Sequence, residues 1–98
     1  MISLENITGF DWDSGNERKS QDKHSVSKFE AEELFFNVPV LLLHDEKHSK
    51  KESRFHALGK TDTGRLLHIT FTIRANKLRV ISARDMHKKE KKVYENNT

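Results

Sequence analysis

The chain has 98 residues, of which 34% are apolar and 34% are charged, and this size fits one domain, spanning 1–98, with a small core. It contains no cysteine, which excludes disulfides, thiolate zinc sites and a Cys nucleophile and agrees with a cytoplasmic protein. The longest apolar run, 38–43, is far shorter than the ~20 residues that span a bilayer, and residues 1–10 lack the pattern of a secretory signal. We therefore expect no contact with a membrane.

Charge is distributed unevenly along the chain. Residues 1–46 hold four Lys/Arg against ten Asp/Glu, a net charge of −6, whereas residues 47–98 hold fourteen against five, a net charge of +9. A basic half of this kind favours a polyanionic partner, with nucleic acid first, although a solvated charged surface has the same composition.

A short strand and a polar helix are expected first. The apolar segment 7–12 fits a short strand, and Asp13 or Ser14 can then cap a helix over 16–23. This helix is polar on every side, so it has no apolar residue to bury.

The second helix is better defined, because Ser27 and Glu30 form a capping box at its start. Pro39 marks its end. Its apolar side is predicted to consist of Ala31, Leu34, Phe35 and Val38.

The hydrophobic period changes to two after Pro39. Strands are predicted at 40–44, 53–59, 66–74 and 78–83, separated by a charged loop at 45–52 and turns at 60–64 and 75–77. The Lys-rich segment 84–95 predicts a C-terminal helix, with 96–98 frayed. This order predicts an α+β fold: a small antiparallel β-sheet with two N-terminal helices packed on one face and a C-terminal helix.

The strand 66–74 carries the first candidate site. Its outward positions hold His68, Thr70, Thr72 and Arg74, which form either a solvated outer face or a shallow surface that presents donors to a phosphate. In the second interpretation, Arg74 and Arg79 across the turn are phosphate clamps, because a guanidinium fork matches two phosphate oxygens.

Histidines offer two further candidates. His24, beside Lys23, is either an ordinary surface histidine or a general acid or base. His44 and His48 lie outside the predicted helices and no further ligand has a suitable spacing, so we expect no metal site.

Cleaving RNA requires a base, an acid and cations that stabilise the phosphoryl oxygens. The groups of these types that stand out are His24, Glu52, Arg54, Arg74, Arg79, Arg84 and Tyr94.

Four segments in a fixed order carry a family resemblance. Residues 10–13 (FDWD) are followed, eleven residues after Trp12, by Lys23 and His24, and 29–36 (FEAEELFF) form an acidic amphipathic helix. His48-Ser49 then precedes Glu52, Arg54 and Gly59, and 79–84 (RVISAR) precedes Glu90 and Tyr94. In this order and spacing the segments resemble the BrnT family, the toxins of type II toxin–antitoxin pairs, over residues 10–94.

The resemblance implies a RelE-like fold and an endoribonuclease that cuts RNA, arrests translation and needs neither a metal nor another cofactor. It also implies a BrnA-like antitoxin as partner, through whose DNA-binding part the complex contacts operator DNA. Together with the charge pattern, the resemblance implies that the catalytic residues are Lys23, His24, Glu52, Arg54, Arg79 and Arg84. The expected RNA-binding residues are Arg65, Arg74, Lys88, Lys89 and Tyr94.

Three positions depart from the family pattern, which usually has Lys, Asn and Gly where this chain has Asn16, Ser20 and Ser25. Because the first helix also lacks apolar residues, we expect it to be weakly held. The alternative function is therefore a non-catalytic or attenuated module that binds the antitoxin and nucleic acid through the same basic face and acts as a co-repressor.

Overall fold

The computed structural model describes residues 4–98, so residues 1–3, part of the segment 1–6 that precedes the resemblance, lie outside the described residues. No helix in the described part of the chain is long and apolar enough to cross a membrane. The elements in chain order are β1 (Gly9–Phe10), α1 (Ser14–His24), α2 (Lys28–Leu34), β2 (Leu41–Asp45), the 3₁₀ helix η1 (Glu46–His48), β3 (Arg54–Lys60), β4 (Leu66–Arg74), β5 (Lys77–Asp85) and α3 (Lys88–Asn96).

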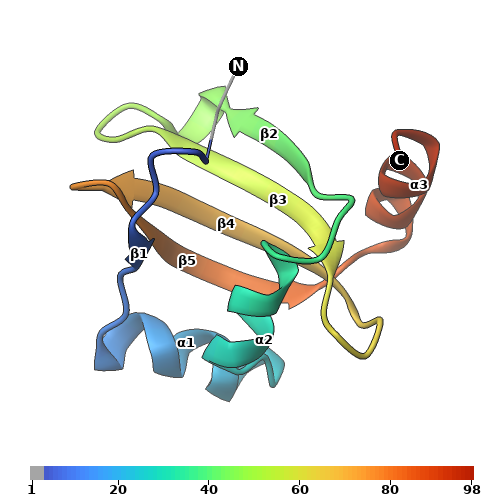
Figure 1. Cartoon of the computed structure of the whole chain (residues 1–98), viewed down its shortest axis with the longest axis horizontal. Coiled ribbons are helices and arrows are strands. Elements are labelled where there is room, and N and C mark those ends of the chain that lie inside the picture. Colours follow the sequence, from blue (N-terminus) through green and yellow to red (C-terminus); the bar gives the residue numbers. More distant parts are fainter. Residues whose placement is uncertain (1–3) are drawn as a thin grey trace.

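The predicted α+β fold is confirmed. The strands lie in the order β1-β5-β4-β3-β2, and β2 to β5 are successive antiparallel neighbours (Figure 1). The segment 7–12 contributes only the two-residue β1, which pairs parallel to β5, so the sheet is mostly rather than wholly antiparallel. β4 has the predicted bounds, since its alternation is uninterrupted. β5 continues to Asp85, so Arg84 belongs to this strand and not to the C-terminal helix.

The main core lies between α2 and one face of the sheet. Leu34 packs over Gly59 of β3, where an added Cβ would stand 2.8 Å from Leu34 Cγ, so this close approach requires glycine. α2 ends at Leu34, and Val38, expected on the packed side, is 80% exposed, because a residue before proline avoids the helical conformation. The buried cluster consists of Val26, Ala31, Leu34, Ala57, Leu67, Ile69, Phe71, Leu78, Val80 and Ala83.

Helix α1 is docked by hydrogen bonds instead of apolar packing. Asn16 Nδ2 donates to the Val80 carbonyl at 3.1 Å, and Ser20 Oγ accepts from the Ala83 amide at 2.9 Å. Asn16 and Ser20 are 8% and 2% exposed, so this helix, although it has no apolar residue to bury, buries two polar side chains. Beyond its short pairing with β1, this edge of β5 has no strand partner among residues 4–98, and the two side chains bond to the peptide groups of Val80 and Ala83.

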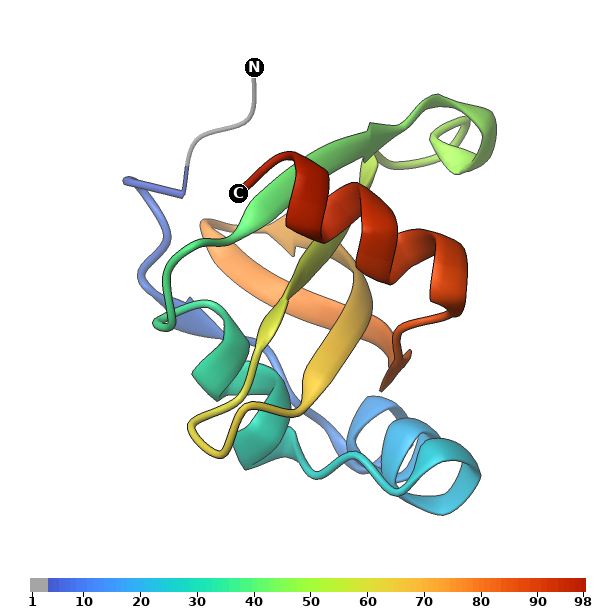
Figure 2. The same cartoon turned by 90° about the vertical axis from the view of Figure 1, so that its right-hand side faces the viewer.

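Helix α3 covers the other face of the sheet at one end. Met86 and Tyr94 form a second buried cluster with Leu58 of β3, whose neighbour Ala57 points into the main core. The Tyr94 hydroxyl donates to the Pro39 carbonyl at 2.7 Å. Figure 2 shows α3 lying across the front of the strands, apart from α1 and α2 at the bottom of the view. The outward face of the sheet is therefore open only at the end away from α3.

Candidate functional site

Three arginines meet at this open end of the outward face. Arg54 of β3 and Arg79 of β5 are the register partners of Thr72 in β4, one on each side, and Arg74 lies two residues further along β4. Alternation along a strand therefore places all of them on one face. They line a single depression of about 470 Å³, which we call the arginine cleft.

Helix α1 and the loop before β3 provide the remaining walls of the arginine cleft. Glu52 comes from the loop, and Lys19 comes from α1, whose position is fixed by its hydrogen bonds to β5. Cations therefore outnumber carboxylates in the cleft. The full lining is Asp13, Gly15, Asn16, Lys19, Glu52, Arg54, Arg74, Arg79, Val80 and Ile81.

Two of the cleft arginines are held by carboxylates. Arg74 donates from Nε and Nη2 to the two carboxylate oxygens of Glu52, both at 2.9 Å. These hydrogen bonds lower the pKa of Glu52 and raise the pKa of Arg74. Arg79 Nη2 donates to Asp13 Oδ2 at 2.8 Å and its Nη1 lies 3.5 Å from Asp11 Oδ1. Both guanidinium groups are thus oriented, and the pKa of Asp13, like that of Glu52, is lowered, so both carboxylates are ionised.

A second depression continues the basic surface. It has a volume of about 370 Å³ and shares Glu52 and Arg54 with the arginine cleft. Its other lining residues are Lys47, His48, Lys50 and Lys51, from η1 and the loop that follows. The three lysines of this stretch were not among the predicted site residues. The two depressions together form a basic track that leads off one side of the arginine cleft.

The structure brings only part of the predicted site together. Glu52, Arg54, Arg74 and Arg79 line the arginine cleft, whereas Arg84 does not. Arg84 lies in β5 beyond an irregularity in the pairing with β4, and its guanidinium donates to both carboxylate oxygens of Glu90 at 2.8 and 2.9 Å. Two residues that line the cleft from α1, Asn16 and Lys19, were not among the predicted site residues.

The other predicted site residues have different surroundings. Arg65 donates to Asp85, to Glu30 and to the carbonyls of residues 24 and 25, so it joins α1 and α2 to the end of the sheet. Tyr94 is 6% exposed. Lys23 and His24 end α1, and Lys88 and Lys89 are exposed at the start of α3. None of these residues lines the arginine cleft.

A chain of histidines and carboxylates connects η1 to α3 across the outward face. Asp45 Oδ2 lies 3.0 Å from His48 Nδ1 and 3.1 Å from His56 Nε2, and the rings of His56 and His68 are 4.7 Å apart. Burial, with the nearby Arg84, lowers the pKa of His68 to about 4, and hydrogen bonds from Arg84 lower the pKa of Glu90 to about 2. In residues 4–98 no group of three or more His, Asp or Glu side chains is arranged to hold a metal ion.

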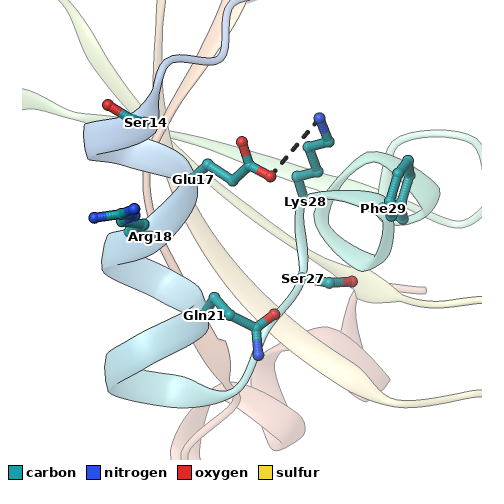
Figure 3. Close-up of a pocket in the computed structure, with 7 residues that line it drawn as sticks. All are labelled: Ser14, Glu17, Arg18, Gln21, Ser27, Lys28 and Phe29. Atoms are coloured by element: carbon teal, nitrogen blue, oxygen red, sulfur yellow. Dashed lines mark ion pairs between the residues drawn. The ribbon is translucent and has the colours of Figure 1, made fainter.

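A groove of about 460 Å³ lies between α1 and the start of α2, on the other side of α1 from the arginine cleft. Figure 3 shows the Glu17–Lys28 ion pair, at 3.7 Å, spanning this groove. Phe29 is 65% exposed at its edge. The lining mixes charges of both signs with an apolar ring, so the groove lacks the concentration of cations found in the arginine cleft.

Comparison with known proteins finds a family match that spans the arginine cleft. A family model described as the ribonuclease toxin BrnT of type II toxin–antitoxin systems matches residues 12–90, which include every residue of the arginine cleft. No curated protein matches the chain. The family match covers most of the chain, and it contains the cations and the carboxylate that phosphate chemistry requires. The chain therefore belongs to the BrnT family of ribonuclease toxins of type II toxin–antitoxin systems.

Proposed function

We propose that the arginine cleft is the place where RNA is cut, by attack of a ribose 2′-hydroxyl on the adjacent phosphate, without a metal ion. One observation carries this proposal: Arg54, Arg74 and Arg79 line the same depression as the carboxylate of Glu52. Guanidinium groups held around one point stabilise the charge that develops on phosphoryl oxygens, which is the task a metal ion performs in other nucleases.

The reaction has a simple balance. The 2′ oxygen forms a bond to phosphorus, the bond from phosphorus to the 5′ oxygen breaks, and the products end in a 2′,3′-cyclic phosphate and a 5′-hydroxyl. Glu52, whose pKa is lowered and which is therefore ionised, accepts the proton of the 2′-hydroxyl. The 5′ oxygen takes a proton from solvent, because the depression is open to water.

RNA must displace the carboxylates that hold the cleft arginines. A phosphate that binds Arg74 releases Glu52 from its two hydrogen bonds, and this release frees both carboxylate oxygens to act on the 2′-hydroxyl. Substrate binding and activation of the base are thereby coupled in one exchange of partners.

The predicted residues outside the arginine cleft take other roles in this proposal. Lys23, Lys88 and Lys89 contact the RNA backbone on either side of the cut, where exposed cations add affinity without sequence preference, and His24, half-buried, lies beside Lys23. Arg84 stabilises the fold by pairing with Glu90 and does not itself touch the RNA.

The docking of α1 favours this enzyme over the alternative of a non-catalytic co-repressor. That alternative rested on a weakly held first helix, and Asn16 and Ser20 instead join the helix to β5 through buried hydrogen bonds. The same family membership implies a cognate antitoxin and an RNA substrate. We propose that the antitoxin is BrnA-like, that it connects the complex to operator DNA, and that free toxin arrests translation in the cytoplasm.

The test is incubation of the purified chain with labelled RNA in EDTA. We expect cleavage with 2′,3′-cyclic phosphate ends, and we expect Arg54→Gln and Glu52→Gln to slow it by about 10²-fold while the fold is retained. Lys28→Gln, which removes a cation from the groove on the other side of α1, should cleave at the wild-type rate. Intact RNA beside a well-folded wild-type protein, or cleavage that requires added metal, would contradict the proposal.

A further inference from the structure

Helix α1 presents two different sides to the molecule. Ser14, Glu17, Arg18 and Gln21 line the groove beside α2, and Figure 3 shows Glu17 and Gln21 pointing toward the start of α2. Gly15, Asn16 and Lys19 line the arginine cleft instead. With 3.6 residues per turn, these two sets fall on nearly opposite sides of the helix. Lys19 and Arg18, although adjacent in sequence, therefore belong to different surfaces.

Hydrogen bonds fix the rotation of α1 about its own axis, and this rotation determines which side of the helix faces the arginine cleft. Asn16 and Ser20, one turn apart, are both hydrogen-bonded to the backbone of β5. Asp13 caps the helix by accepting from the Asn16 amide at 3.0 Å, and its other carboxylate oxygen holds Arg79. Lys19, three residues after Asn16, is thereby held at the wall of the cleft that faces the strands.

The cations of the arginine cleft differ in their partners. Arg74 and Arg79 are engaged by Glu52 and by Asp13. Lys19 and Arg54, by contrast, form no ion pair with any carboxylate among residues 4–98. A phosphate can therefore reach Lys19 and Arg54, which come from α1 and β3, before it displaces Glu52 from Arg74.

We infer that Lys19 is a catalytic residue of the RNA-cleaving site, which contacts a non-bridging oxygen of the scissile phosphate from the α1 side. The inference rests on the proposed function of the arginine cleft. As the 2′ oxygen attacks, negative charge grows on that phosphoryl oxygen, and the Lys19 ammonium stabilises it opposite the guanidinium of Arg54. The role is electrostatic, so it requires a cation at this position but no proton transfer.

The chain offers a matched control for this inference. Lys19→Gln and Arg18→Gln each remove one positive charge from neighbouring exposed positions of the same helix, so they change the net charge equally. Only Lys19 lines the arginine cleft. Neither side chain forms a hydrogen bond that docks α1, which leaves the fold of both variants intact.

The experiment measures kcat and KM for a short RNA with wild type, Lys19→Gln, Lys19→Arg and Arg18→Gln. We expect Lys19→Gln to lower kcat by about 10²-fold with a smaller change in KM, Lys19→Arg to retain most of kcat, and Arg18→Gln to resemble wild type. If the wild type cleaves and Lys19→Gln cleaves as fast as Arg18→Gln, the inference is wrong although the proposed function stands.

A second measurement separates the failure of this inference from failure of the proposed function. An RNA with 2′-O-methyl groups cannot be cut, so its binding can be followed whether or not the wild type cleaves RNA. We expect Lys19→Gln to weaken this binding more than Arg18→Gln does, because only Lys19 contacts the phosphate in the cleft. If both variants lose the same RNA affinity, Lys19 contributes only to the general positive charge, and the assignment is wrong.

Discussion

The carboxylate of Asp13 connects the start of helix α1 to Arg79 in the cleft. Its Oδ1 accepts from the Asn16 amide at 3.0 Å as the N-cap, and its Oδ2 accepts from Arg79 at 2.8 Å. The hydrogen bond from the Asn16 amide, followed by that from Arg79, lowers the pKa of Asp13. One side chain thus sets both the position of a helix and the availability of a cation in the arginine cleft.

Replacing Asp13 in two ways separates these roles. Asp13→Asn keeps an N-cap acceptor but removes the charge that holds Arg79, so we expect unchanged stability and RNA binding that is about two- to fivefold tighter. Asp13→Ala should bind RNA equally well and melt at a lower temperature, because the cap is lost. Thermal unfolding and fluorescence anisotropy with uncleavable RNA measure the two effects. Weaker RNA binding by Asp13→Asn would mean instead that Asp13 holds Arg79 in the orientation that binds phosphate.

The docking of α1 leads to a prediction about stability. Ser20→Ala leaves the buried amide of Ala83 without its partner, which we expect to lower the free energy of unfolding by about 1–2 kcal/mol. Ser14→Ala, at an exposed position of the same helix, should change it by less than about 0.5 kcal/mol. Urea denaturation of both variants provides the comparison. Equal stability of the two would show that the hydrogen bond to β5 contributes nothing to the docking of α1.

This docking could not be predicted from hydrophobic patterning. Periodicity identifies β4 correctly, because its apolar residues alternate, and the capping box of Ser27 and Glu30 identifies the start of α2. The helix α1 has no apolar side. It is held because buried peptide groups of β5 need hydrogen-bond partners, and side chains that lie 63 and 64 residues away in sequence supply them. A local pattern contains no information about such a distant requirement.

The candidate site was predictable to a similar degree. The residue types and the family resemblance indicated Glu52, Arg54, Arg74 and Arg79; the antiparallel register brings the three arginines together, and the loop before β3 adds Glu52. Arg84 has the same side chain as Arg79 and lies on the same strand, but its guanidinium is hydrogen-bonded to Glu90 of α3. Which carboxylate each arginine meets, Asp13 in the cleft or Glu90 of α3 outside it, depends on how the helices pack, and the sequence pattern does not specify that packing.

Burial of His68 predicts a loss of stability in mild acid. Its pKa is lowered from 6.5 to about 4 by burial and by Arg84, so between these values the unfolded chain binds a proton that the folded chain does not. Stability contributed by neutral His68 is therefore present above pH 6.5 and is lost as the pH falls toward 4. We expect His68→Gln to reduce the fall in unfolding free energy between pH 6.5 and 4.5 by up to about 2 kcal/mol.

The control for this effect is His44→Gln, because His44 is exposed in the folded chain. Glu90, whose pKa is lowered to about 2, contributes stability that is lost only as the pH falls below 4.5, so its effect lies mostly outside the measured window. Urea denaturation at each pH gives the slopes. If His68→Gln and the wild type have the same pH dependence, His68 is not held neutral by burial.

Ser25 leads to a prediction of increased stability. It ends helix α1 with φ of 54° and ψ of 37°, a left-handed conformation that costs a residue with a Cβ about 1 kcal/mol and costs glycine almost nothing. Ser25→Gly relieves this strain but raises the entropy of the unfolded chain, so we expect a net gain of about 0.5 kcal/mol. Ser14→Gly, at the right-handed start of the same helix, should instead destabilise by about 0.5–1 kcal/mol. Opposite shifts of the urea midpoint are the expected result. A loss of stability in both variants would show that the Ser25 side chain contributes more than its backbone strain costs.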